Sequence, residues 1–335
     1  MEAKEKRRAG AAAEPPPPDG VAERLPRVQA ALLAWFDAEQ IALPWRQGRS
    51  PYAVLVSEFM LQQTQRERVI PKFLAFMERF PDLRTLAAAS TADVIRAWSG
   101  LGYNSRALRL QQIARQVVTT GGALPSDVEA LRCLPGVGEY TAQAISCFAF
   151  DEPVACVDTN VRRVLARIFG AAERLSKAGV AVLASRALVR DRPADWNGAL
   201  MDLGARICRA RAPLCGNCPV ARWCAARAAF STEAGSALPR VAEAKPGYRT
   251  ASRPKRQQPP FTASDRYLRG RIVAVLVELP DGATLAIEDL AVRASGMALP
   301  PQTERVRELA SRLVREGLIA LAENGAGAAG YRLPA

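Results

Sequence analysis

The chain contains no histidine among its 335 residues. This absence excludes histidine-dependent catalytic triads, zinc fingers of the Cys/His type and the usual proton shuttle at neutral pH. Any proton transfer must therefore depend on carboxylates, tyrosine, lysine or water.

Long apolar runs are also absent, and none approaches the roughly 20 residues that span a bilayer. The N-terminus lacks the apolar core of a signal peptide, and Glu2, Glu5 and Glu14 argue against a transit peptide. We therefore expect a soluble, intracellular protein.

Acidic residues are fewer than basic ones, with 33 Asp and Glu against 46 Lys and Arg, which gives a net charge of +13. Such an excess favours a polyanionic partner, because each neutralised phosphate releases condensed counterions. A generally basic soluble protein is the alternative. The length permits one large domain or two to three smaller ones.

The cysteines are clustered. Four of the seven cysteines fall close together: Cys208, Cys215, Cys218 and Cys224. In an intracellular chain this spacing predicts metal ligands rather than disulfides, and four thiolates suit either zinc or a [4Fe–4S] cluster. Cys133, Cys147 and Cys156 lie in apolar contexts and are expected in the core.

Composition also divides the chain. Residues 1–24 are charged, Ala-rich and Pro-rich and predict a disordered tail, and residues 231–263 predict a linker. Residues 264–335 predict three helices followed by a small β-wing. This winged-helix pattern is typical of modules that bind DNA and of modules that bind proteins.

A helix is predicted from Pro51 through Thr64, because Ser50 is a good N-cap and proline suits the first helical position. Glu58 stands inside this apolar helix, and Gln62 follows one turn later on the same face. Taken alone, such a carboxylate is more typical of a narrow exposed strip than of a partly buried acid.

The stretch from Leu134 to Thr141 predicts a hairpin between two helices. Gly136 and Gly138 would let a phosphate approach main-chain amides at the positive end of the following helix. Asp158 would cap the next helix and could reach a DNA sugar from there. The alternative is an ordinary helix–helix turn with a plain capping aspartate.

Tyr103 follows two glycines in a turn. A tyrosine at such a tip can wedge into a base stack, and the alternative is a half-buried packing residue.

Together these motifs resemble the helix-hairpin-helix DNA glycosylases, and most closely the A/G-specific adenine glycosylases of the MutY type. The resemblance covers roughly residues 25–230. Its motifs are Leu43-Pro-Trp45-Arg46, Ser57-Glu58-Phe-Met-Leu-Gln62-Gln63-Thr64, Gly100-Leu-Gly-Tyr103, Leu134-Pro-Gly-Val-Gly-Glu-Tyr140-Thr, Val157-Asp158-Thr-Asn160-Val-Arg-Arg-Val and the four spaced cysteines.

The resemblance implies an all-α, two-lobed glycosylase domain with a [4Fe–4S] cluster on the loop 208–224, acting as a monomer on double-stranded DNA at the bacterial nucleoid. It implies that the target base is turned out of the duplex. Glu58 would be the general acid that protonates the departing adenine, kept protonated near neutrality by its apolar neighbours. Asp158 would stabilise or covalently trap the oxocarbenium-like sugar. Tyr140 and Asn160 would orient the two acids.

Further roles follow from the same resemblance. Gln62, Gln63 and Tyr103 would fill the vacated stack and contact the opposite guanine. Trp45 and Arg46 match the region of the base pocket, and the amides of Gly136 and Gly138 would hold a phosphate.

Position 140 separates the subfamilies. Lyases of the endonuclease III type have a lysine there that forms a Schiff base, whereas this chain has Tyr140, so strand cleavage should be weak or absent. We expect removal of adenine opposite 8-oxoguanine or guanine. A thymine/uracil glycosylase acting at G mismatches is the alternative, because some of those also have tyrosine there. A non-catalytic iron–sulfur DNA-binding protein is disfavoured by Glu58 and Asp158.

One region departs from the pattern. Longer members of the family carry a Nudix-like, β-rich C-terminal domain that reads 8-oxoguanine, and residues 264–335 predict helices with a wing instead. This difference leaves the preference for the oxidised guanine in doubt, but not the base removed.

Overall fold

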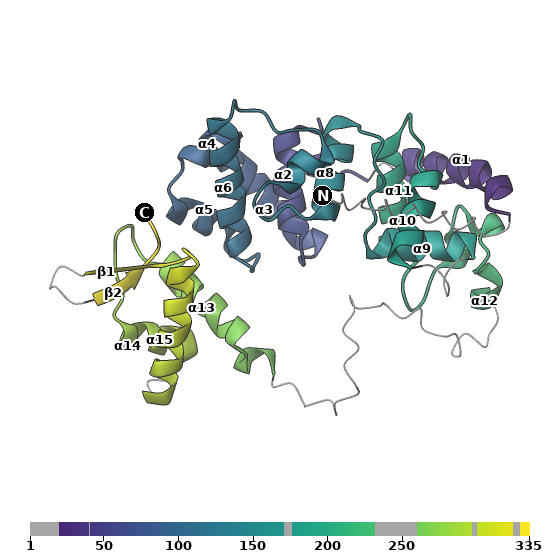
Figure 1. Cartoon of the computed structure of the whole chain (residues 1–335). Coiled ribbons are helices and arrows are strands. Elements are labelled where there is room, and N and C mark those ends of the chain that lie inside the picture. The colour runs from purple at the N-terminus through teal and green to yellow at the C-terminus, as the bar shows by residue number, and fades with distance from the viewer. Residues whose placement is uncertain (1–19, 40, 171–175, 232–259, 297–299, 324–328) are drawn as a thin grey trace, which may run out of the picture. The chain divides into compact units, whose positions relative to one another are not determined.

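The structure of the chain, a computed structural model, describes residues 20–39, 41–170, 176–231, 260–296, 300–323 and 329–335 (Figure 1). The described residues are mostly helical, which confirms the predicted all-α class. Their one sheet pairs β1 (Ala320–Glu323) antiparallel to β2 (Ala329–Arg332), with Ala320 opposite Arg332. No helix in this part of the chain is long and apolar enough to cross a membrane.

The chain divides into two compact units. Unit 1 combines Met1–Ile41 with Pro153–Ala244, and unit 2 combines Ala42–Glu152 with Lys245–Ala335. The described elements of unit 1 are α1 (Val21–Glu39), α9 (Thr159–Phe169), α10 (Lys177–Ala187), α11 (Pro193–Arg206), η2 (Cys215–Asn217), η3 (Ala221–Trp223) and α12 (Arg227–Ser231). Those of unit 2 before residue 245 are η1 (Pro44–Arg46), α2 (Pro51–Leu61), α3 (Arg66–Arg79), α4 (Leu83–Ala88), α5 (Thr91–Trp98), α6 (Ser105–Thr119), α7 (Val128–Arg132) and α8 (Glu139–Phe150).

Helix α2 is the central helix of unit 2. Its residues from Tyr52 to Met60 are all buried, because α3, α6 and α8 pack around it. The predicted cap is confirmed, since the Ser50 hydroxyl accepts a hydrogen bond from the Ala53 amide at 3.2 Å. The helix ends at Leu61 rather than at Thr64, because Gln62 leaves the helical region with a ψ of 112°, and Gln63 then adopts the left-handed conformation with a φ of 57°.

In unit 1, α1 and α9 pack against α11. The shared core includes Leu32, Leu165, Trp196 and Leu203. Of the predicted N-terminal tail, residues 1–19 lie outside the described part, and residues 21–24 are helical because α1 begins at Val21, four residues earlier than the tail prediction allows.

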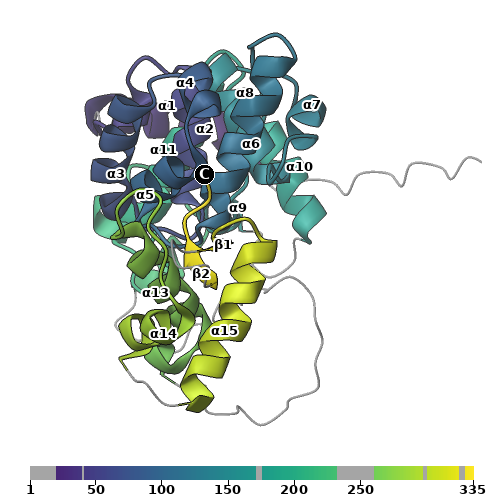
Figure 2. The ribbon, with the colours of Figure 1, turned by 90° about the vertical axis from the view of Figure 1, so that its left-hand side faces the viewer.

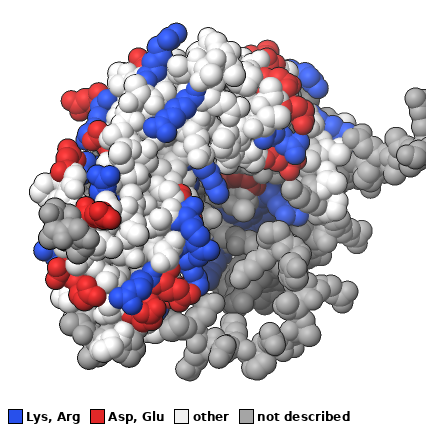
Figure 3. All heavy atoms as spheres, turned by 60° about the vertical axis from the view of Figure 1, so that its left-hand side comes forward, with Lys and Arg blue, Asp and Glu red and all other residues white. Residues whose placement is uncertain are grey.

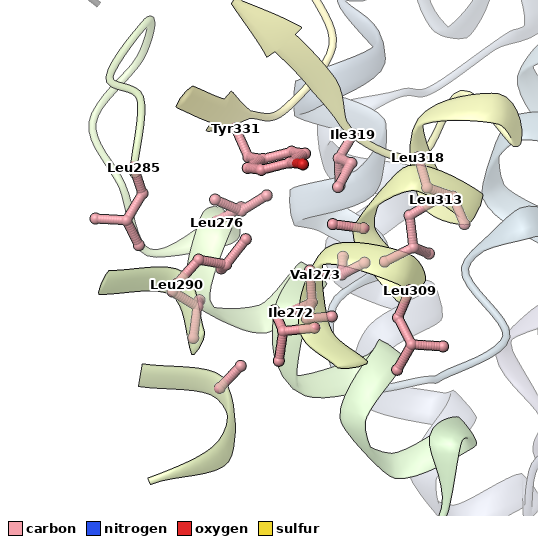
Figure 4. Close-up of a cluster of buried hydrophobic side chains, with 14 of the residues drawn as sticks. Ile272, Val273, Leu276, Leu285, Leu290, Leu309, Leu313, Leu318, Ile319 and Tyr331 are labelled. Atoms are coloured by element: carbon pink, nitrogen blue, oxygen red, sulfur yellow. The ribbon is translucent and has the colours of Figure 1, made fainter. Parts of the chain in front are cut away.

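The C-terminal module, residues 260–335, contains η4 (Phe261–Ala263), α13 (Asp265–Val277), α14 (Ile287–Ser295), α15 (Pro300–Arg315) and the β1–β2 hairpin (Figure 2). Its apolar core joins the three helices to the hairpin through Ile272, Leu290, Leu309 and Tyr331 (Figure 4). This arrangement matches the predicted three helices and wing. The predicted linker lies almost wholly outside the described residues.

The module packs on α5 within unit 2. Ile95 belongs to the same apolar core, and Arg96 forms an ion pair with Asp281 at 2.5 Å. The Thr91 amide also donates a hydrogen bond to the carbonyl oxygen of Ala335 at 3.4 Å.

Candidate active site and nucleic-acid interface

Glu58 lies near the C-terminal end of α2 and is buried, with 9% of its surface exposed. The prediction made from the apolar run alone, an exposed carboxylate, is therefore wrong. The reason is that α2 is enclosed by three other helices and has no solvent-facing strip from Tyr52 to Met60. Burial on a central helix keeps this carboxyl group largely away from solvent.

Gln62 and Gln63 follow Glu58 at the end of α2. The Gln62 amide donates a hydrogen bond to the Thr141 hydroxyl at 3.4 Å, which ties the end of α2 to the start of α8. Gln63 is exposed, and its left-handed backbone turns it away from the helix.

Arg106, on α6, holds the turn at the end of α2 in place. Its buried guanidinium group donates hydrogen bonds to the carbonyl oxygens of Phe59, Met60 and Gln62 at 2.7, 3.0 and 2.6 Å. The same group donates to the carbonyl oxygen of Gly102 at 2.9 Å. Burial lowers the pKa of Arg106 to about 10. One side chain thus satisfies the last carbonyls of α2 and holds two loops.

The second of these loops carries Tyr103, which has a φ of 49° and is 40% exposed. Its ring is flanked by two guanidinium groups, with the Arg106 and Arg266 carbons 5.6 and 5.1 Å from the ring centroid. The structure therefore exposes part of the Tyr103 ring, which packs between these two guanidinium groups.

The predicted hairpin joins α7 to α8. Gly136 has a φ of +78°, and a Cβ there would lie 2.6 Å from Arg109 Cδ, so both conformation and space favour glycine. Gly138 is the N-cap of α8 and has open space around it. Both glycines are exposed, and Tyr140 is half-buried in the first turn of α8. Exposed glycines at a helix start are suited to bind an anion.

Trp45 and Arg46 lie in η1. Trp45 is 8% exposed and packs edge-on against Phe73, with ring centroids 5.5 Å apart. Arg46 is half-buried.

In unit 1, Asp158 is the N-cap of α9, and both of its carboxylate oxygens are hydrogen-bonded. Oδ1 accepts from the Val161 amide at 2.7 Å, and Oδ2 accepts from the Asn160 side-chain amide at 2.9 Å. These two bonds fix the orientation of a half-buried carboxylate.

Asn160 is held in turn by Arg163, which donates to its side-chain oxygen at 2.8 Å. The Arg163 guanidinium also donates to the carbonyl oxygens of Gly204 at 2.8 Å and Cys208 at 2.9 Å. A chain of hydrogen bonds therefore runs from the first cysteine of the predicted cluster to Asp158. Helix α11 approaches closely, since a Cβ on Gly204 would lie 2.7 Å from Asn160 Cβ.

The four clustered cysteines line one small pocket of unit 1. Burial, reinforced by the three other sulfurs, raises the pKa of the Cys218 thiol to about 11. None of the seven cysteines forms a disulfide, although among the described residues no three potential ligands have the arrangement of a metal site. Cys147 and Cys156 are buried as predicted, whereas the prediction is wrong for Cys133, which is exposed at the C-cap of the short helix α7.

Arg167 borders this cysteine pocket and is itself 4% exposed. It donates to Cys208 Sγ at 3.4 Å and to the carbonyl oxygen of Arg209 at 2.7 Å, while its Nε has no hydrogen-bond partner. Within the described part of the chain it forms no ion pair with a carboxylate. A buried cation without a counter-charge is costly, so the pocket fits a group that brings negative charge.

Each unit thus gathers its own set of predicted residues. Unit 2 holds Glu58, the glutamine pair, Tyr103 and the hairpin, and unit 1 holds Asp158, Asn160 and the cysteines. The sequence reasoning missed Arg106, Arg163 and Arg167. The sequence gives little indication of their roles, because an arginine in a helix is normally exposed. Only the buried carbonyl groups that these side chains bind, which come from other parts of the chain, reveal a structural role.

Comparison with known sequences places these residues in context. Residues 56–186 match the model of the HhH-GPD superfamily of base excision DNA repair proteins. The Adenine DNA glycosylase of Mycolicibacterium smegmatis is 38% identical over 300 residues, which cover 88% of this chain and 93% of that protein. The chain belongs to the adenine DNA glycosylase family.

Other relatives match over a smaller share of this chain and of their own length. The Adenine DNA glycosylase of Mycobacterium tuberculosis H37Rv is 42% identical over 73% of this chain and 77% of its own length. The human Adenine DNA glycosylase is 44% identical over 59% of this chain and 39% of its own length.

Solved structures share the fold. A thermostable thymine-DNA glycosylase is 29% identical with a TM-score of 0.59, covering 63% of this chain and 99% of that one. Endonuclease III in a non-covalent DNA complex is 22% identical with a TM-score of 0.52, covering 60% and 95%, and this likeness concerns the fold alone. The predicted helix-hairpin-helix glycosylase fold is confirmed.

Proposed function

We propose that the chain hydrolyses the N-glycosidic bond of adenine mispaired with 8-oxoguanine or guanine in duplex DNA. The observation that carries the proposal is the pair of acids in different environments: Glu58 buried on α2, and Asp158 held by hydrogen bonds to Val161 and Asn160. Two carboxyl groups with separate environments can divide the work of acid and sugar stabiliser.

In the proposed reaction Glu58 donates its proton to the departing adenine as the bond from the base to the sugar breaks. The electron pair of that bond leaves with the base, and positive charge develops on the sugar. The Asp158 carboxylate stabilises or covalently traps this sugar, and water then adds to give the abasic site. Tyr140 and Asn160 orient these groups.

The remaining predicted residues have binding roles. Gln62, Gln63 and Tyr103 occupy the space that the extruded nucleotide leaves and contact the opposite guanine, while Trp45 and Arg46 contribute to the base pocket. The amides of Gly136 and Gly138 hold a phosphate. Exposure of Gln63, Tyr103 and the two glycines supports this assignment. We place the protein on nucleoid DNA as a monomer.

We also propose that Cys208, Cys215, Cys218 and Cys224 hold a [4Fe–4S] cluster. Four thiolates in one pocket suit iron–sulfur ligation, and the buried Arg167 would gain the counter-charge that it lacks. When bound, the cluster would supply that negative charge and cross-link the loop. The loop that begins at Cys208 then orients Asp158 through the hydrogen bonds of Arg163 and Asn160.

The test is a single-turnover assay of the full-length protein on duplexes that contain A:8-oxoG, A:G, T:G and U:G pairs. We expect free adenine from the first two and no base from the others. Release of thymine or uracil instead would establish the alternative activity, and no adenine release would refute the proposal.

The monofunctional character is tested on the same duplexes by borohydride trapping. With Tyr140 in place of an amine, no Schiff base should form, so borohydride should trap no enzyme–DNA adduct. A trapped adduct would show that another amine of the chain acts as a nucleophile.

A further inference from the structure

A large pocket of about 960 Å³ lies within unit 2, where the C-terminal module meets the loops that carry Gln63 and Tyr103. The loop residues 63–65 and 99–105 line one side, and residues of α13 line the other. The module therefore shares a surface with two residues to which the proposed function assigns contacts with DNA.

The pocket is positively charged. Four arginines line it, namely Arg68, Arg266, Arg269 and Arg271, and no lining residue that the structure describes is acidic. Arg269 pairs with Glu316 at 2.5 Å, whereas Arg266 is exposed and makes no ion pair within the described residues. On the face shown in Figure 3, Lys and Arg side chains run through the middle beside a hollow, with acidic side chains at the edges and next to the lower end of that run. Such a surface attracts a phosphate backbone.

Exposed aromatic rings accompany this charge. Phe261 is 62% exposed and contacts Tyr267 edge-on, with ring centroids 5.7 Å apart. Both rings line the pocket, as does Tyr103, above which the Arg266 guanidinium lies. Basic groups interleaved with exposed aromatic rings are the usual means of holding a nucleic-acid strand with unstacked bases.

Gly270 leaves a bare stretch on the wall of the pocket. It stands inside α13, where glycine costs helix stability, yet it lines the pocket and a Cβ there would meet nothing within 4 Å. Packing within the protein thus does not require glycine at this position, and its effect is to leave open space on the wall of the pocket.

We propose that the C-terminal module forms part of the DNA-binding surface and holds the strand opposite the target adenine. Arg266, Arg68 and Arg271 contact phosphates of that strand, and Phe261 and Tyr267 pack against a base or sugar next to the unpaired guanine. The inference rests on the proposed function, because that function assigns Gln63 and Tyr103 to the opposite strand. A protein partner on the module is the competing outcome.

The first experiment measures the dissociation constant of the full-length protein for an A:G duplex whose adenine carries a 2′-fluoro sugar that resists cleavage. Arg266→Gln should weaken binding about tenfold and reduce the salt slope by about one phosphate. The matched control is Arg293→Gln, which removes the same charge from an exposed site on α14 outside the pocket and should change binding less than about twofold.

Equal effects of the two substitutions, or no effect of Arg266→Gln, would overturn the proposal. The readout is binding to an uncleaved duplex, so it remains informative even if the wild-type protein releases no adenine. Conversely, the wild-type protein could excise adenine while Arg266→Gln binds DNA as tightly as the wild type. That result would support the proposed function and refute only the DNA-binding role of the C-terminal module.

The second experiment identifies the strand. 5-Iodouracil is placed next to the guanine or, in a separate duplex, next to the adenine, and the irradiated complexes are mapped by mass spectrometry. A cross-link to residues 261–267 from the guanine strand is expected, and it should be lost in Phe261→Ala with Tyr267→Ala but kept in Leu321→Ala, an exposed residue of the wing. Cross-links to the module from the adenine strand alone, or none at all, would refute the assignment.

Substitutions at Gly270 separate folding from binding. Gly270→Ala should raise the melting temperature and preserve affinity, because the space is open. Gly270→Glu should keep the fold but weaken binding by placing a negative charge on the pocket wall. Unchanged affinity in Gly270→Glu would show that DNA does not enter the pocket.

Discussion

The guanidinium group of Arg106 donates a 2.6 Å hydrogen bond to the carbonyl oxygen of Gln62, the C-cap residue of α2. The same group reaches the loop of Tyr103 through the Gly102 carbonyl. One buried cation on α6 therefore sets the backbone of both loops whose exposed residues, Gln63 and Tyr103, we assign to DNA contact.

Arg106→Lys is expected to destabilise the protein by about 3 kcal/mol, because an ammonium group cannot reach the same carbonyls and leaves buried acceptors unpaired. Denaturant unfolding measures this change. Arg109→Lys, an exposed position on the same helix, should alter stability by less than about 0.5 kcal/mol. Equal stability of both variants would contradict the role of Arg106.

Asp158→Asn should lower the single-turnover excision rate by at least about 10³-fold, because the charge that stabilises the sugar is lost. Asparagine is also a good N-cap, so α9 should remain folded and DNA affinity should change little. Gel-shift titration and circular dichroism provide these controls. A variant with wild-type turnover would show that Asp158 only caps the helix.

Glu58→Gln conserves shape in a buried position but removes the proton donor. We expect the excision rate at neutral pH to fall by about 10²- to 10⁴-fold with the melting temperature nearly unchanged. Retained turnover at neutral pH would place the general acid elsewhere in the chain.

Gly204→Ala tests the chain of hydrogen bonds to Asp158. The added methyl group would lie 2.7 Å from Asn160 Cβ and displace the amide that donates to the carboxylate. A displacement on the order of 1 Å can lower the rate by about 10²-fold. The neighbouring, exposed Ala205→Ser is the control and should keep its rate. Full activity of Gly204→Ala would mean that Asn160 does not orient Asp158.

Cys218→Ser should reduce the iron content and the visible absorption of the purified protein, whereas Cys133→Ser, at an exposed cysteine outside the pocket, should change neither. Loss of the cluster should also leave the charge of Arg167 uncompensated and lower the thermal stability. Wild-type iron content in Cys218→Ser, or zinc in its place, would refute the proposed cofactor.

Much of the local structure could be predicted from residues close in sequence. Ser50 and Asp158 are each predicted to cap a helix, and each accepts a hydrogen bond from an amide three residues later. Caps depend on neighbours along the chain, so they are readable without a fold. Helix α4, by contrast, has only six residues, which are too few for a periodic pattern to predict it.

The sequence by itself determined the family motifs, the helix caps at Ser50 and Asp158, and the pattern of helices with a wing at the C-terminus. Only the tertiary structure decided that Glu58 is buried, that Cys133 is exposed, and that Arg106, Arg163 and Arg167 bind main-chain carbonyls. Burial and carbonyl partners come from helices distant in the chain, and no local pattern of residues specifies which helices enclose which side chain. The basic pocket beside the C-terminal module arises for the same reason.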